Sequence, residues 1–189
     1  MTRCARSLLT ISIALLALAA CDTVGIKRSY MALDAKGYRQ RNAFQTDTES
    51  IYCVAEMASG VDDVTVVAKV RARSLFDPFN GRRVTVDGSA VVGAEEQAPG
   101  RGEDLILAFH LLKPEGDEFY PAGEFSCDLY VDGKREESLD FVVRYPDCPF
   151  EPIKAESSCA GVVLYGSECP SPLGARCVCS EESEQWECE

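Results

Sequence analysis

The stretch GEFSCDLYVDG, residues 123–133, decides the fold class. Its apolar side chains at positions 125, 127, 129 and 131 share one parity, which is typical of a β-strand with one buried face. Asp132-Gly133 predicts a tight hairpin turn, because glycine tolerates the positive φ that such turns require. Leu139, Phe141, Val143 and Tyr145 then alternate in the same way. Residues 123–145 therefore predict a β-hairpin that packs against a core.

The same two-residue alternation continues on the N-terminal side of this hairpin. It predicts strands over residues 51–57 and 63–73, a short strand over 82–86, and a central strand in the apolar run 105–112. Residues 91–103 contain three glycines and a proline and predict a loop. No segment has a helical period. We therefore expect an all-β domain of about seven short strands over residues 41–147.

Residues 1–20 have the composition of an export signal. Arg3 and Arg6 precede an apolar stretch, residues 8–20, which is shorter than the ~20 apolar residues that span a membrane. Leu18-Ala19-Ala20-Cys21 resembles a lipobox, the motif at which bacterial lipoproteins are lipidated and cleaved. The resemblance implies a signal peptide over 1–20, lipid on Cys21, and an anchor in a bacterial envelope membrane, with the protein in the periplasm or on the cell surface. The alternative is an ordinary signal peptide followed by a cysteine.

Charge and composition exclude some partners. Removing Arg3 and Arg6 from the 19 basic residues leaves 17 against 31 acidic ones, a formal net charge of −14. Such a chain is repelled by nucleic acid and by anionic lipid. Residues 21–40 mix charges and isolated apolar residues, and we expect a lipidated N-terminus and tether, with room for a first edge strand.

Eight cysteines remain after the signal and the lipidated position are set aside, and their even number in an exported chain predicts four disulfides. They are Cys53, Cys127, Cys148, Cys159, Cys169, Cys177, Cys179 and Cys188. The last six permit 15 pairings, among which the sequence does not choose. A zinc site is the rival interpretation, but the spacing Cys-x-Cys and the lack of histidine after position 110 are unusual for one.

Cys53 and Cys127 lie on the inward parity of an early and a late strand. This arrangement resembles the cysteine pair that links the two sheets of an immunoglobulin-like β-sandwich, and Gly-Glu-Phe-Ser-Cys at 123–127 is similar to the approach to its second cysteine. Position 125 is Phe, so the hydroxyl of the tyrosine corner is missing there. The resemblance implies a Cys53–Cys127 bridge and covers about 100 residues.

Residues 148–189 resemble a short cysteine-rich module of exported proteins from Gram-negative bacteria, in which Cys-x-Cys is followed by Trp-x-Cys. The resemblance implies export and disulfides and no chemical activity. A segment this short, with few large apolar side chains, needs covalent staples. We therefore expect an immunoglobulin-like β-sandwich followed by a small disulfide-rich module, each folding on its own.

Residues suited to catalysis are few. His110 lies inside an apolar run, where histidine is more often structural than catalytic. The acid pairs Asp62-Asp63, Glu95-Glu96 and Asp117-Glu118 fall in expected turns, and the sequence predicts neither cofactor nor metal. We expect a non-catalytic lipoprotein that binds an unknown protein or envelope partner. The alternatives are a passive spacer and an enzyme with a carboxylate-based site.

Overall fold

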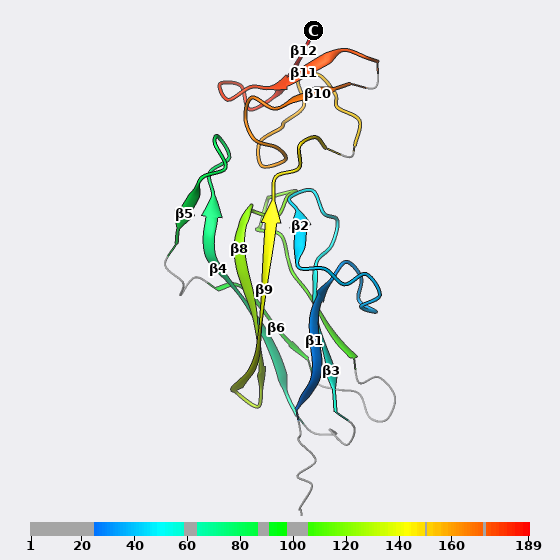
Figure 1. Cartoon of the computed structure of the whole chain (residues 1–189), viewed down its shortest axis with the longest axis vertical. Helices are drawn as coiled ribbons and strands as arrows, with labels where there is room; N and C mark the ends of the chain where they lie inside the picture. The colour runs from blue at the N-terminus through cyan, green and yellow to red at the C-terminus, as the bar shows by residue number, and fades with distance from the viewer. Residues whose placement is uncertain (1–24, 59–63, 87–90, 98–105, 150, 172) are drawn as a thin grey trace, which may run out of the picture.

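The alternating segments form two facing sheets, with a third, small sheet beyond one end of them (Figure 1). The computed structural model describes residues 25–58, 64–86, 91–97, 106–149, 151–171 and 173–189. These residues contain strands and no helix, which confirms the all-β prediction.

The first sheet has the strand order β1-β3-β7, and its neighbours are antiparallel. Its strands are β1 (Ile26–Ala32), β3 (Tyr52–Met57) and β7 (Ile106–His110). The second sheet has the order β2-β9-β8-β4-β5, and β6 also pairs with β4. Its strands are β2 (Ala43–Gln45), β4 (Val66–Phe76), β5 (Arg83–Thr85), β6 (Val91–Gln97), β8 (Gly123–Val131) and β9 (Lys134–Arg144).

The order of these strands is that of an immunoglobulin-like sandwich. The first sheet corresponds to strands A, B and E of that fold, and β4, β8 and β9 correspond to C, F and G. A disulfide joins Cys53 of β3 to Cys127 of β8 and so links the two sheets. Both cysteines are fully buried, in one apolar core with Phe109 and Leu129. The β8–β9 turn has positive φ at both Asp132 and Gly133, as the predicted hairpin requires.

Two expectations need correction. Residues 91–97 are not a loop: they form β6, which pairs antiparallel with β4. Glycine and glutamate are poor strand formers, but a neighbouring strand that offers its hydrogen bonds overrides that preference. The sandwich also begins before residue 41, because the edge strand for which residues 21–40 left room is β1, and it pairs with β3. A bulge between Ile26 and Arg28 shifts the parity of β1, so its sequence shows no sustained alternation.

Tyr120 supplies the bond that the phenylalanine at position 125 cannot make. Its ring is buried, and its hydroxyl donates to the carbonyl of Leu111 at 2.8 Å. The same oxygen accepts a hydrogen bond from the backbone N–H of Ile51 at 3.3 Å. The hydroxyl therefore ties the β7–β8 connection to the start of β3, in the manner of a tyrosine corner.

The C-terminal module, residues 148–189, has its own sheet and its own apolar cluster. The sheet consists of β10 (Glu168–Pro170), β11 (Arg176–Cys179) and β12 (Trp186–Cys188). Three disulfides join Cys148 to Cys169, Cys159 to Cys179, and Cys177 to Cys188. Trp186 is buried among these bridges together with Val163. Covalent staples and one large aromatic side chain thus substitute for an extended core.

The module contacts the end of the sandwich through a few specific bonds. The hydroxyl of Thr46 is fully buried and donates to the carbonyl of Val162 at 2.8 Å. The N–H of Tyr165 donates to the carbonyl of Pro78 at 3.0 Å, and Phe119 packs against the apolar cluster of the module. The two parts have separate cores and share a small, hydrogen-bonded contact.

Candidate functional site

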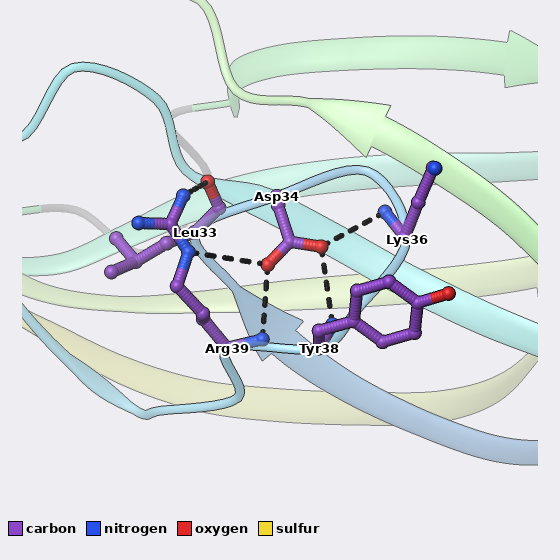
Figure 2. Close-up of polar contacts among 5 residues, drawn as sticks. All are labelled: Leu33, Asp34, Lys36, Tyr38 and Arg39. Atoms are coloured by element: carbon purple, nitrogen blue, oxygen red, sulfur yellow. Dashed lines mark hydrogen bonds and ion pairs between the residues drawn. The ribbon is translucent and has the colours of Figure 1, made fainter.

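The loop between β1 and β2, residues 33–42, is organised around the carboxylate of Asp34 (Figure 2). Its Oδ1 accepts hydrogen bonds from the backbone N–H groups of Lys36 and Tyr38, both at 3.1 Å. Its Oδ2 accepts one from the backbone N–H of Arg39 at 2.9 Å, and the Arg39 side chain lies 3.4 Å from the same oxygen. One short side chain therefore holds the backbone of the whole loop.

Two further features hold this loop to the first sheet. Gly37 has a φ of +72°, and a Cβ at this position would lie 2.4 Å from the Tyr30 hydroxyl. Glycine is favoured here, because the backbone is in the left-handed region and a Cβ would displace the Tyr30 ring. The Tyr30 hydroxyl in turn donates to Glu56 of β3 at 3.0 Å. The backbone N–H of Arg41 also donates to the carbonyl of Met31 at 3.0 Å and ties the loop to β1, while the Tyr38 side chain is 82% exposed.

The hydrogen bonds to Asp34 also set its protonation. Desolvation acts to raise the pKa of this carboxyl group, but the bonds from Tyr38 and Arg39 outweigh it and hold the pKa below the ordinary value of 3.8. Asp34 is thus an ionised structural group at neutral pH. A carboxylate with a lowered pKa is a poor general acid.

A groove of about 830 Å³ lies beside this loop. Its walls are the 33–42 loop, β2, the segment 45–50, Tyr52 of β3, and the segment 144–147 at the end of β9. The parallel pairing of β2 with β9 brings Gln45 opposite Arg144 and so joins the two distant parts of the chain. The groove is the candidate functional site because it combines a concave surface with a rigid, pre-formed wall.

Charges of both signs line the groove. Four are acidic and three are basic: Asp34, Asp47, Glu49, Asp147, Arg39, Arg41 and Arg144. Arg39 is paired with Asp34, whereas Arg41 and Arg144 form no ion pair with the residues that the structure describes. The Oδ1 atom of Asp47 is buried and has no hydrogen-bond partner within the described ranges.

Tyr145 connects the groove to the C-terminal module. Burial, with Tyr165 and Asp77 nearby, raises the pKa of Tyr145 to about 12. Its hydroxyl is therefore neutral at physiological pH, and Tyr145 is one of the residues that line the groove. The residue that follows β9 therefore lines the groove and also lies near Tyr165 of the module.

The residues that the sequence singled out lie elsewhere. Cys21 and the pair Asp62-Asp63 fall outside the described residues. The eight remaining cysteines all form disulfides, which leaves the zinc alternative without thiolate ligands. Glu95-Glu96 lies in β6 rather than in a turn, and Asp117-Glu118 lies on the β7–β8 connection, outside the groove.

His110 contacts a residue that lines the groove. It stacks on Tyr52 with 4.9 Å between ring centroids, and its Nε2 is buried without a partner among the described residues. The histidine itself does not line the groove. Sequence reasoning does not find the groove because residues 34–40 have no period and are expected to belong to the tether, whereas the other lining residues belong to the expected sandwich. The one local signal was the turn-forming composition of Asp34-Ala35-Lys36-Gly37.

The fold and the site together define a class of protein: an immunoglobulin-like sandwich with a cysteine-stapled module and a polar groove beside their junction. No known family and no curated protein matches this sequence. The described part of the chain contains no helix long and apolar enough to cross a membrane. It also contains no cluster of three or more histidine, cysteine or acidic residues suited to a metal ion. The four disulfides are compatible with an extracytoplasmic location.

Proposed function

We propose that this protein is a non-catalytic lipoprotein of a bacterial envelope that binds a partner through the groove beside the 33–42 loop. The observation that carries the proposal is the groove itself: its wall is held by Asp34, and it contains charges that form no ion pair with the described residues. A site built in advance lowers the ordering cost of binding.

The lipid on Cys21 would also orient the molecule. β1 begins at the end of the sandwich opposite to the C-terminal module (Figure 1). Four residues separate Cys21 from Ile26, and a chain of that length reaches at most ~14–18 Å. The anchor would therefore hold the β1 end of the sandwich at the membrane. The module and the adjoining groove would face away from the bilayer, which favours a partner outside that membrane.

The anchor is tested by changing Cys21→Ser. We expect this variant to lose incorporation of labelled fatty acid and to leave the membrane fraction or accumulate with its signal peptide attached. Two or three acyl chains make a firm anchor, since each buried CH₂ contributes about 0.8 kcal/mol. A variant that still incorporates fatty acid and sediments with membranes would disprove lipidation at this residue.

The binding site is tested by photocrosslinking in intact cells. A photoreactive phenylalanine analogue is placed at Tyr38, which is exposed in the 33–42 loop and is followed by Arg39, a residue that lines the groove. The matched control carries the same analogue at Val84, which is 51% exposed on β5 and does not line the groove. We expect a defined adduct from position 38 and none from position 84. No adduct from either position, or the same adducts from both, would favour the passive spacer over the binding protein.

A further inference from the structure

One residue of β2 has a backbone N–H and a carbonyl that are placed to pair with a ligand in the groove. The carbonyl of Asn42 accepts from Val142 at 2.9 Å, and the N–H of Thr46 donates to Arg144 at 3.0 Å. Backbone groups alternate in direction along a strand, so Ala43 and Gln45 face away from β9. Gln45 uses both its groups on Thr48, through bonds of 3.1 and 3.0 Å. Ala43 is exposed and lines the groove, and its N–H and carbonyl are oriented to extend the ladder.

The carboxylate of Asp47 lies four residues further along the same wall. Its buried Oδ1 accepts no hydrogen bond from the described residues. The Asp47 side chain as a whole is half-buried, lines the groove and forms no ion pair with the described residues, so an ammonium group bound in the groove would meet an unpaired carboxylate and could form a charge-assisted hydrogen bond with it. Asp47 thus supplies a recognition point for a cation inside the groove.

Arg41 and Arg144 supply the opposite charge. Both line the groove, and neither forms an ion pair within the described ranges. With four acidic and three basic side chains, the groove is nearly neutral as a whole. This balance disfavours a polyanion or a polycation and fits a ligand that carries one charge of each sign.

We propose that the groove binds the N-terminal end of a short extended peptide. The α-ammonium group meets Asp47, one peptide unit pairs with Ala43, and a carboxylate at the other end of the ligand meets Arg41 or Arg144. Ala43 and Asp47 are separated by at most ~13–14 Å, which is the span of about four extended residues. Capture of a chain terminus together with pairing along a strand edge is a recurrent mode of peptide recognition.

This inference rests on the proposed function. The first test varies the ligand and leaves the protein unchanged. The protein is the exported, disulfide-bonded chain carrying Cys21→Ser, titrated by NMR or calorimetry. The probes are tetraalanine with free termini, N-acetyl-tetraalanine and tetraalanine amide. We expect acetylation to weaken binding about ten- to hundredfold, because it removes the charged donor. Amidation should weaken binding to a smaller extent, since Arg41 and Arg144 are more exposed to solvent screening.

The protein side is tested by Asp47→Asn, with Asp117→Asn as the matched control outside the groove. We expect the first variant to lose about tenfold in affinity for free tetraalanine and to bind the acetylated peptide as the parent does. The control should bind both peptides unchanged. If Asp47→Asn fails to fold, the comparison of acetylated with free peptide still tests the inference, because it leaves the protein unaltered.

Equal affinity for free and acetylated tetraalanine, or no binding of either at millimolar concentration, would overturn the inference. In that case a defined adduct from position 38 would leave the proposed function standing with a different ligand. If neither peptide binding nor the adduct is observed, both the inference and the proposed function are rejected. The mass of the adduct also distinguishes the source of the terminus, since a free peptide and a partner protein differ widely in mass.

Discussion

Asp34 shows how much of the candidate site depends on one side chain. It holds three backbone N–H groups and the Arg39 guanidinium, and it lies at the surface of the molecule. Its carboxylate must be ionised to accept all of them, because a protonated carboxyl group loses acceptor capacity. The shape of the groove wall is therefore linked to the charge of one residue.

The lowered pKa of Asp34 predicts a pH dependence with a definite sign. A carboxyl group whose folded-state pKa is depressed stabilises the folded loop above the ordinary value of 3.8, and that contribution is lost as the pH falls through the folded-state value. We expect the amide NMR signals of Tyr38 and Arg39 to shift with a midpoint below 3.8. Asp34→Asn should abolish this transition and increase hydrogen exchange in the loop at neutral pH. A midpoint above 3.8 would contradict this account of the loop.

Among the elements, β3 and β8 carry the link between the sheets. Cys53 and Cys127 are separated by 74 residues and are both fully buried, so their bridge closes a long loop through the core. A cross-link of this length restricts the unfolded chain more strongly than any single one of the three shorter bridges of the module does. The stability of the sandwich should accordingly depend on this pair.

Replacing both Cys53 and Cys127 by Ala should lower the free energy of unfolding of the sandwich by about 4 kcal/mol. Urea denaturation under oxidising conditions, followed through a probe in the sandwich, measures the change. The matched control replaces Cys148 and Cys169 by Ala, which should destabilise the module and leave the transition of the sandwich nearly in place. An unchanged sandwich transition in the first variant would show that packing alone holds the sheets together.

At the scale of the whole molecule, the contact between sandwich and module is small but specific. Thr46 and Phe119 reach from the sandwich into the module, yet each part has its own apolar cluster. Separate cores indicate separate folding, and the shared contact indicates mutual stabilisation. The groove adjoins this junction through Tyr145.

Truncation after Asp147 should therefore leave a folded sandwich with a lower melting temperature. The fragment loses the bond from Thr46 to Val162 and uncovers Phe119, but it keeps the core and its disulfide. Circular dichroism and thermal melts measure both effects, and the isolated module should fold only under oxidising conditions. A fragment without a cooperative transition would mean that the chain is one domain.

The sequence alone predicted the all-β fold class and the hairpin at Asp132-Gly133, which follow from alternation and parity, properties of a few neighbouring residues. The pairing of Cys53 with Cys127 was implied by the resemblance to an immunoglobulin-like sandwich. The sequence did not determine β1, β2 or β6, because a strand at a sheet edge or with a bulge is specified by its partner rather than by its own pattern. The pairings among the six cysteines of the module were equally open, since spacing does not report which sulfurs meet.

The groove was decided by tertiary structure. Its walls come from residues 33–52 and 144–147, about a hundred positions apart, and they meet because β2 pairs parallel with β9. No local pattern announces such a site, since its residues are polar, aperiodic and brought together by distant backbone pairing. The local sequence indicates which side chains of a segment are buried. The shape of the surface between two segments is set only when the segments have packed against each other.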